Sequence, residues 1–421
     1  TFTGNNAAIN ALDENDADVI LTTTIRVEDP QNAADTNTLT ITIDGANDAP
    51  IIETAEGLSQ TLTERADGDD NENGPPPLTI TGIITFADAE INDSHSATVV
   101  ADAVDEMGNP TAFDRDGNPI TEAQYIGTLS SGISNSATGD GEGEITYTFS
   151  VSDALLDSLN EGETIIQTYR VNVSDGQDNA TAQTVTITLV GTNDQPVITV
   201  DAGNGDTDAA SISETDDPQV RNDPLTASGT LSVADVDLND VVTAEVTSVT
   251  VGAGSTGPTA EIPDATLLSF LTVNSPVIDD ANTTGTINWN FNSATMTASE
   301  AFDFLAAGET LVLEYTITVT DSSLDENDDP TANNTDTQVV TITITGTNDA
   351  PDISVGMSDS ASAELSETDA PLTASGTLSV ADADITDIVS VSVDGVMVAA
   401  ASTGPVDQVS EADLLSFFSV D

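Results

Sequence analysis

The sequence predicts an all-β protein built from tandem antiparallel β-sandwich domains in a linear array. Short runs rich in Thr, Val and Ile alternate polar with apolar residues, which buries one face of each strand and leaves the other in solvent. Gly, Asn and Asp residues separate these runs, as turns do in sandwiches. A six-residue string also recurs three times, which is typical of a repeat protein. Helix is expected only as single turns within 263–270 and 299–306.

The recurring string, Gly-x-Asn-Asp-x-Pro, divides the chain into repeats. It begins at Gly45, Gly191 and Gly346, at spacings of 146 and 155 residues, and each copy follows an alternating Thr-Ile-Thr strand. The longer spacing is explained by a polar insertion near 325–330, because loops tolerate insertions. The predicted units are 1–49, the C-terminal part of a truncated repeat; 50–195 and 196–350, two complete β-sandwich repeats; and 351–421, the N-terminal half of a further repeat.

Acidic and amide residues recur at equivalent positions of the repeats. Each string supplies an Asn-Asp pair, a glutamate lies downstream of it, and an Asp-x-Asp/Glu pair then follows a strand of shared sequence. A further aspartate ends a later strand. These candidate metal ligands are Asn47, Asp48, Glu64, Asp88, Glu90, Asp175, Asn193, Asp194, Glu214, Asp235, Asp237, Asp321, Asn348, Asp349, Glu367, Asp382 and Asp384.

The charge of the chain excludes several classes of partner. It has 74 acidic and 5 basic residues, and its formal net charge is −69. Phosphate binding needs a basic patch, so nucleic acid is excluded, and anionic membrane surfaces are disfavoured for the same reason. No apolar run approaches the roughly 18 to 20 residues of a membrane span, so membrane insertion is not expected.

The same charge favours a bound cation. So much like charge opposes compaction unless divalent ions or a salty medium relieve it. Calcium takes six to eight oxygen ligands at flexible geometry, whereas magnesium prefers to keep several waters. The chain has no cysteine and one histidine, His95, so it offers almost nothing to zinc or copper. Ca²⁺ is therefore the expected cofactor, and the recurring acidic positions are its expected ligands.

No catalytic constellation stands out in the sequence. Paired carboxylates serve as acid and base in glycosidases, but the carboxylates here recur, whereas catalysis normally needs one unique site. His95 has no counterpart in the other complete repeat, and no Gly-rich phosphate loop is evident. The chain is therefore not expected to be an enzyme.

The string Thr-Gly-Thr-Asn-Asp-Ala-Pro at 345–351, after a Val-Thr-Ile-Thr strand, resembles the VCBS repeat of giant bacterial surface proteins. Those proteins belong to the calcium-dependent RTX-type adhesins exported by type I secretion. The layout is also similar to cadherin repeats, which have an Asn-Asp-x-x-Pro-like linker and an Ala-x-Asp-x-Asp motif. The resemblance implies Ig-like sandwiches, calcium at the junctions and a secreted protein on the bacterial cell surface. The repeats are longer than the common VCBS unit, and the Gly-rich RTX nonapeptide is absent from this sequence.

The cadherin-like layout also implies which residues meet. The linker residues Asn47 and Asp48 would meet Asp88, Glu90 and Asp175 at one pole of the following repeat. The equivalent groups are Asn193 and Asp194 with Asp235, Asp237 and Asp321, and Asn348 and Asp349 with Asp382 and Asp384. The implied contacts at the opposite pole are those of Glu64 with the 193–194 linker and of Glu214 with the 348–349 linker.

The function that these features predict is a calcium-stiffened extender in a large bacterial adhesin, acting in cell adhesion and biofilm formation. Its partners would be neighbouring repeats of the same chain, with surface glycans or other cells bound through regions outside this sequence. Two alternatives remain open. One is a structural subunit of an extracellular filament. The other is a glycan- or ice-binding module, which would use Trp289 to stack on sugars or Thr-x-Thr faces such as Thr40 and Thr42 to bind ice; the simpler interpretation of Trp289 is a core residue.

Overall fold

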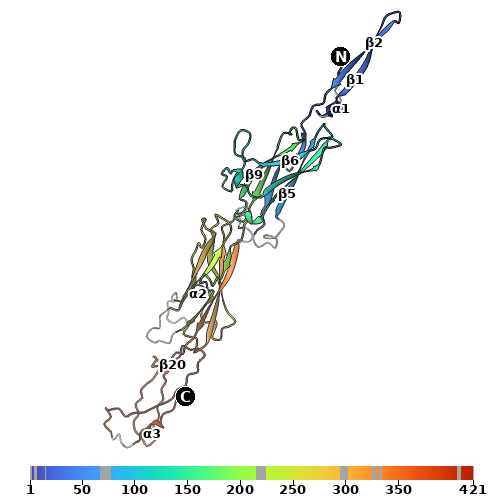
Figure 1. Cartoon of the computed structure of the whole chain (residues 1–421). Helices are drawn as coiled ribbons and strands as arrows, with labels where there is room; N and C mark the ends of the chain where they lie inside the picture. Colours follow the sequence, from blue (N-terminus) through green and yellow to red (C-terminus); the bar gives the residue numbers. More distant parts are fainter. Residues whose placement is uncertain are drawn as a thin grey trace.

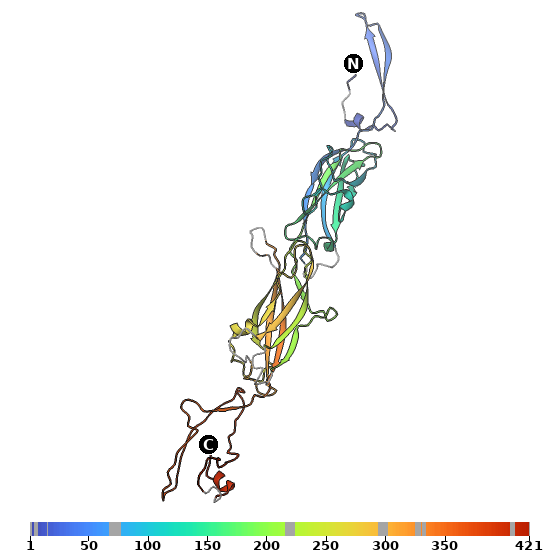
Figure 2. The ribbon, with the colours of Figure 1, turned by 90° about the vertical axis from the view of Figure 1, so that its left-hand side faces the viewer.

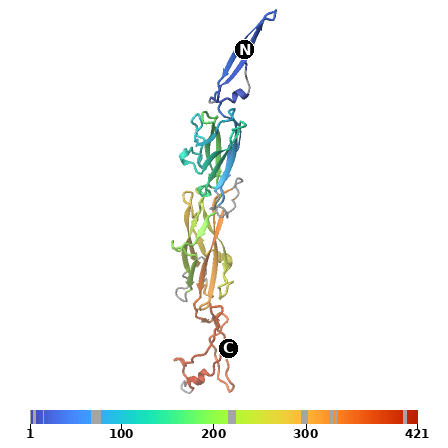
Figure 3. The same ribbon diagram turned by 45° about the vertical axis from the view of Figure 1, so that its right-hand side comes forward.

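The computed structural model describes residues 2–3, 7–14, 16–66, 77–214, 224–293, 302–324, 330, 334–404 and 409–420. The chain forms a line of successive units, with the two termini toward opposite ends (Figures 1 and 2). An N-terminal hairpin is followed by two β-sandwiches and then by a segment with little regular structure (Figure 3). The predicted fold class, all-β with tandem sandwiches in a linear array, is confirmed.

The first sandwich consists of two four-stranded sheets. In spatial order, one sheet contains β3 (Ile51–Glu56), β5 (Leu78–Ala87), β8 (Glu142–Val151) and β7 (Thr128–Asn135). The other contains β4 (Ser59–Thr63), β10 (Gln183–Val190), β9 (Thr164–Ser174) and β6 (Ser96–Ala101). All neighbouring strands are antiparallel except β4 and β10, which run parallel. The sandwich is therefore mixed at one edge, where the sequence predicted only antiparallel pairs.

The second sandwich repeats this topology strand for strand. One sheet contains β11 (Val197–Thr199), β13 (Thr226–Ala234), β16 (Thr284–Asn292) and β15 (Leu271–Val273). The other contains β12 (Ala209–Ser213), β18 (Thr335–Thr345), β17 (Thr310–Thr320) and β14 (Thr243–Val251). The single parallel pair, β12 with β18, is equivalent to β4 with β10. The two sandwiches are thus two copies of one architecture.

Each core is filled by residues from the alternating faces and by one large aromatic ring at an equivalent place. Tyr147 of β8 and Trp289 of β16 each lie opposite a glycine of the neighbouring strand, Gly82 and Gly229. A Cβ at Gly82 would lie 2.1 Å from the Tyr147 Oη, and one at Gly229 would lie 2.4 Å from the Trp289 ring. The Trp289 Nε1–H donates to the Thr207 carbonyl at 2.8 Å. Trp289 is 1% exposed, which rules out the sugar-stacking alternative for this residue.

The ends of the chain carry fewer strands. At the N-terminal end, α1 (Ala7–Asn10) precedes an antiparallel hairpin of β1 (Val19–Glu28) and β2 (Ala34–Ile43). At the C-terminal end the elements are β19 (Asp352–Ser354), β20 (Ser379–Ala381) and α3 (Glu411–Leu415).

Helix is scarce in the described residues. The first predicted helical turn is α2 (Asp264–Leu268), within 263–270. Of the second, 299–301 lies outside the described residues and 302–306 forms turns, because Phe302 and Leu305 close a short turn over the core. Two 3₁₀ turns complete the set, η1 (Glu122–Gln124) and η2 (Asp153–Leu155). Among the described helices, none has the length and apolar character that crossing a membrane requires.

Candidate metal centres at the repeat junctions

Strand pairing brings each linker to the acidic ends of neighbouring strands. In the second sandwich β11 starts beside the end of β13, since Val197 pairs with Ala234, so the preceding linker lies next to Asp235. The same pairing joins Ile51 to Ala87 in the first sandwich and Asp352 to Ala381 in the C-terminal segment. The recurring Asp-x-Asp/Glu pair follows the second strand, in chain order, of each of these pairs. Sheet topology therefore places linker and aspartates together at three successive junctions.

The recurring glycine that opens each linker is required by a close backbone approach. A Cβ at Gly191 would lie 2.1 Å from the Leu159 carbonyl oxygen, and one at Gly346 would lie 2.0 Å from the Leu305 carbonyl oxygen. At Gly45 the equivalent contact is the Asp13 carbonyl oxygen, at 2.2 Å. A side chain at these positions would collide with backbone, which explains why the string begins with glycine.

The central junction holds a buried cluster of three carboxylates. Asp235 follows β13, Asp321 follows β17, and Asp240 lies five residues after Asp235; one carboxylate oxygen of each lies within 4.8 Å of the others. Their exposed fractions are 2%, 6% and 4%. The Ser323 hydroxyl donates to Asp240 at 2.9 Å, and the Ser323 N–H donates to Asp321 at 2.9 Å. Asp235 Oδ2 has no hydrogen-bond partner among the described residues.

The 193–194 linker closes over this cluster. The Asp194 N–H donates to Asp237 Oδ2 at 2.8 Å, and the Asn193 amide donates to Asp321 Oδ2 at 3.4 Å. The Asp237 N–H in turn donates to Asp235 Oδ1 at 3.1 Å. All five of these residues are buried. The structure thus brings together the whole set that the sequence nominated for this junction.

Burial disfavours the ionised form of these carboxylates and raises their pKa values. Burial raises the pKa of Asp237 to about 9, and the neighbouring Asp194 and Asp235 charges add to the effect. Burial also raises the pKa of Asp235 to about 7 and that of Asp321 to about 6, with Asp240 contributing to both. Low dielectric and like charges both favour the protonated form. The cluster is therefore destabilised as a set of anions unless a positive charge joins it.

Glu64 reaches the same junction from the first sandwich. It follows β4, and the parallel pairing of Thr63 with Val190 places it beside the start of the linker. Its Oε2 accepts the Thr192 N–H at 3.0 Å, while its Oε1 has no partner within the described part of the chain. Burial raises the pKa of Glu64 to about 9, and the charges of Asp194 and Asp157 raise it further.

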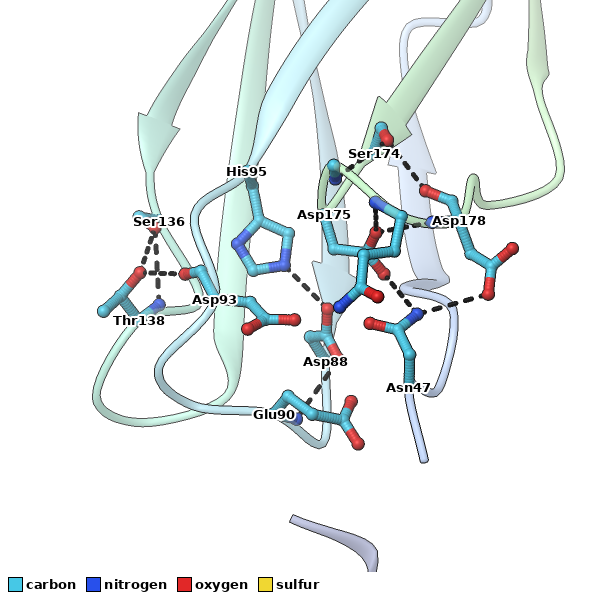
Figure 4. Close-up of polar contacts among 12 residues, drawn as sticks. Asn47, Asp88, Glu90, Asp93, His95, Ser136, Thr138, Ser174, Asp175 and Asp178 are labelled. Atoms are coloured by element: carbon cyan, nitrogen blue, oxygen red, sulfur yellow. Dashed lines mark hydrogen bonds and ion pairs between the residues drawn. The ribbon is translucent and has the colours of Figure 1, made fainter. Parts of the chain in front are cut away.

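The first junction has a similar cluster of Asp88, Asp93 and Asp175, whose carboxylate oxygens lie within 4.8 Å of one another (Figure 4). The Asn47 amide donates to Asp175 Oδ2 at 3.1 Å, and the His95 Nε2 lies 2.8 Å from Asp88 Oδ2. Burial raises the pKa of Asp93, and the charge of Asp13 from the preceding segment adds to it. This junction therefore also gathers carboxylates from both sides of a linker.

Two further predicted residues of the first junction differ in how deeply they lie. The Glu90 N–H donates to Asp88 Oδ1 at 3.2 Å, and neither Glu90 carboxylate oxygen has a partner among the described residues. Burial raises the pKa of Glu90 to about 7, with contributions from Asp88 and from Asp48. Asp48 itself is exposed, unlike its buried counterpart Asp194.

The third junction is built around Glu214, Asp303 and Asp349, again with carboxylate oxygens within 4.8 Å of one another. The Thr347 N–H and hydroxyl both donate to Glu214 Oε2, at 2.8 Å each. The Asp349 N–H donates to Asp384 Oδ2 at 2.9 Å, which repeats the contact of Asp194 with Asp237.

The remaining predicted ligands of this junction are less enclosed. The Asp384 N–H donates to Asp382 Oδ1 at 3.2 Å, so these two residues lie together. The Asn348 amide donates to the Asp349 carbonyl at 2.9 Å and is not directed at the carboxylates. Glu367 is exposed in the C-terminal segment, away from the clusters found among the described residues.

Sequence reasoning missed three residues of these clusters and also Asp157, whose charge raises the pKa of Glu64, although a signal for each was present. Asp93 and Asp240 lie five residues after the first aspartate of the Asp-x-Asp/Glu pair, and Asp387 repeats that position. Asp157 and Asp303 lie five residues before the recurring Gly-Glu-Thr string that opens β9 and β17. Aligning the loops as well as the strands would have found them.

Comparison with known proteins gives only distant structural likenesses. No family model matches the chain, and no curated protein matches it. Among solved structures, the zebrafish RET cadherin-like domains 1 to 4 share 10% identity over 78% of this chain, with a TM-score of 0.22. Mouse cadherin-23 EC22–24 shares 13% over 72% with a TM-score of 0.28, and the Yersinia pseudotuberculosis adhesin InvE shares 12% over 70% with a TM-score of 0.21.

The matched regions also cover only part of those structures. They span 58% of the RET structure, 67% of the cadherin-23 structure and 58% of InvE. Structural similarities with such low TM-scores carry no argument about this chain. Its fold is established by its own strand pairing.

Proposed function

We propose that this chain is an extender region of a large bacterial cell-surface adhesin, in which Ca²⁺ bound at the junctions stiffens a row of β-sandwiches. The observation that carries the proposal is the central junction. There, three buried carboxylates of the second sandwich converge, Glu64 of the first sandwich accepts a hydrogen bond from the linker, and Asp235, Asp237 and Glu64 each retain an oxygen with no partner among the described residues.

The donor set fits a hard divalent cation. A buried carboxylate without a counter-charge is costly, and an unpaired oxygen in a low dielectric adds to that cost. Each described arginine pairs with a carboxylate that is not a member of these clusters. These pairs are Arg26 with Glu28, Arg65 with Asp153, Arg115 with Glu163 and Arg170 with Asp102. Oxygen ligands alone, in a chain without cysteine, favour Ca²⁺ over zinc or copper.

The residues that would hold the ion are those that already converge. At the central junction they are Asp235, Asp240 and Asp321, joined by the linker residues Asn193 and Asp194. The equivalent sets are Asp88, Asp93 and Asp175 with Asn47 at the first junction, and Glu214, Asp303 and Asp349 at the third. When bound, Ca²⁺ supplies the positive charge that lets these carboxylates stay ionised side by side.

The protein's own groups give the bound state its stiffness. The linker is held by N–H bonds on two sides, from Asp194 to Asp237 in one sandwich and from Thr192 to Glu64 in the other. A linker fixed between two sandwiches transmits orientation from one repeat to the next. Because repeats contact only their neighbours, an array of this kind gains length without a larger core.

The proposal places the protein outside the cell, secreted to the bacterial surface, with neighbouring repeats as its direct partners. The VCBS-like strings support this location, and the acidic, cysteine-free composition suits a chain whose repeats are cross-linked by calcium. Glycans or other cells would be bound by regions beyond this sequence. The role is mechanical and adhesive, in cell adhesion and biofilm formation, and no catalytic step is assigned to the chain.

The test compares the protein with and without the ion. We expect calorimetric Ca²⁺ binding in the wild type and a narrower, longer distance distribution in small-angle scattering when Ca²⁺ replaces chelator. The variant Asp235→Asn with Asp240→Asn should lose affinity by about tenfold or more, equivalent to about 1.4 kcal/mol. The matched control is Asp279→Asn with Asp280→Asn, two exposed aspartates of the same repeat. Unchanged affinity in the first variant, or equal loss in both, would refute the proposal.

A further inference from the structure

One loop of the first sandwich reaches across the central junction and touches the second sandwich directly. This clamp loop, residues 158–163, lies between η2 and β9. The Asn160 side-chain amide donates to Asp240 Oδ1 at 2.5 Å, and Glu163 Oε1 accepts the Asn239 side-chain amide at 3.5 Å. Within the first repeat, Gly162 N–H donates to the Gly191 carbonyl at 3.1 Å. The clamp loop is thus tied both to the linker and to the pole of the next sandwich.

A single arginine, Arg115, contacts both ends of the clamp loop. The Arg115 Nη2 donates to the Ser158 hydroxyl at 2.7 Å, and its Nη1 donates to the Ser158 carbonyl. The same Nη1 lies 3.5 Å from Glu163 Oε2, so the guanidinium joins the two ends of the loop. The Arg115 side chain is 19% exposed, which limits competition from water. A planar guanidinium with several fixed donors is suited to fixing a loop in one orientation.

The backbone that carries Arg115 is itself fixed. Arg115 lies in a five-residue turn in which Asp114 Oδ1 accepts the Asp116 N–H at 3.1 Å and the Asn118 N–H at 2.8 Å. Just before the turn, Phe113 exchanges two backbone hydrogen bonds with Ile166 of β9, at 2.9 and 2.8 Å. The turn is therefore attached to the strand that the clamp loop leads into, and Arg115 projects from a rigid support.

The second sandwich has the loop without the arginine. Its equivalent loop, 304–309, keeps the glutamate contact, since Glu309 Oε1 accepts the Thr386 hydroxyl at 2.9 Å as Glu163 accepts Asn239. However, alanine stands at position 306, where the first sandwich has Asn160. The only basic residue of 196–350 is Arg221, which lies outside the described residues. The arginine-held clamp is a feature of the central junction among the described parts of the chain.

We propose that Arg115 is a positioning residue that fixes the angle between the two sandwiches through the clamp loop, without needing a bound cation. The contacts of Arg115, Asn160 and Glu163 join protein atoms to protein atoms directly. When divalent ions are removed, the central junction would therefore keep a narrower range of angles than it would without Arg115. This inference goes beyond the calcium proposal and does not depend on it.

The test measures the spread of inter-sandwich distances. Because the chain has no cysteine, Thr128→Cys on β7 and Ser248→Cys on β14, both exposed, can carry a spin-label pair in the otherwise intact protein. In chelator we expect a narrow distance distribution for the parent protein and one about twice as wide for Arg115→Gln, since a released hinge samples more angles. Arg115→Lys keeps the charge but not the planar guanidinium with its several donors, so its distribution should have an intermediate width. The thermal midpoint of the sandwich should be nearly unchanged, because Arg115 lies outside the core and the buried Leu159 still anchors the clamp loop to it.

Arg170→Gln is the matched control. Arg170 is in the same sandwich and pairs with Asp102 at 2.7 Å, away from the clamp loop, so this variant removes the same charge and should keep the parent width. The inference would be overturned if the distance distribution of the parent protein in chelator were already as wide as that of Arg115→Gln. It would also be overturned if Arg115→Gln and Arg170→Gln widened the distribution equally. If Ca²⁺ narrows none of the distributions, the calcium proposal fails while the comparison in chelator still decides the role of Arg115.

Discussion

At the scale of single residues, the junctions gather carboxylates that burial disfavours as anions. Asp235, Asp237 and Asp321 have pKa values raised above the ordinary range, and burial is the largest cause for each. Their charge can be removed by protons or balanced by a cation. Under the proposed function, protons and Ca²⁺ therefore compete for the same oxygens.

This competition predicts opposite pH dependences of stability with and without Ca²⁺. In the folded state the pKa is about 9 for Asp237 and about 6 for Asp321, above the value of about 3.9 for an unfolded aspartate. Without Ca²⁺ the folded state binds more protons, so this contribution to stability is complete below about pH 4 and is lost as pH rises through about 6 to 9. With saturating Ca²⁺ the sign reverses, because the ion binds the deprotonated groups.

Thermal unfolding between about pH 5 and pH 8, in chelator and in Ca²⁺, measures both slopes. This window avoids the groups whose pKa is lowered, such as Asp206, because they have already ionised above about pH 4. A midpoint that rises with pH in chelator would show that the buried carboxylates are not the groups that control stability.

The single residues also show what the sequence can and cannot reveal. The Asn-Asp and Asp-x-Asp/Glu pairs are visible because they adjoin strands whose alternation can be aligned. Asp240 and Asp303 were not predicted, since they lie in loops whose path depends on turns such as the one at Asn239, which has a φ of 74°. Asp48 and Glu367 recur in sequence but are exposed, because recurrence alone does not fix burial.

At the scale of elements, period-two alternation predicted the strands but not the direction in which they pair. The parallel pairs, β4 with β10 and β12 with β18, were not predicted, because a strand of five residues has the same alternation whichever way its neighbour runs. Those pairs have a consequence for the site. They place Glu64 and Glu214 beside the linkers, where the cadherin-like layout had implied them.

The linker glycine offers a prediction at this scale. Gly191→Ala should destabilise the first sandwich by about 1–3 kcal/mol, the usual cost of forcing a group into packed structure. The new Cβ would lie 2.1 Å from the Leu159 carbonyl oxygen, which belongs to the clamp loop. Denaturant unfolding checks the stability, and the spin-label pair described above should show a wider distribution.

Gly132→Ala is the control for this substitution. Gly132 lies in β7 of the same sandwich, and a Cβ there would meet nothing within 4 Å. This variant should be as stable as the parent protein or slightly more stable, because alanine restricts the unfolded chain. If the two substitutions had equal effects, the close approach at Gly191 would not be the reason for the recurring glycine.

At the scale of the whole molecule, the net charge of −69 acts along an elongated row of units. Cations can act on this charge in two ways, by screening exposed carboxylates or by binding at the buried clusters. Exposed carboxylates repel one another across solvent, and any salt screens that repulsion. The buried clusters at the junctions are screened far less, because mobile ions do not enter them without binding.

This distinction predicts that NaCl cannot replace Ca²⁺. In about 1 M NaCl the Debye length falls to about 3 Å, so repulsion between exposed groups is largely removed. Small-angle scattering in chelator with that salt should show weaker repulsion between molecules but the same broad distribution of overall lengths. Millimolar Ca²⁺ should narrow the distribution at either salt concentration, because it fills sites of defined oxygen geometry. If NaCl alone produced the narrow distribution, screening of surface charge would explain the stiffness, and the buried carboxylates would not contribute to it.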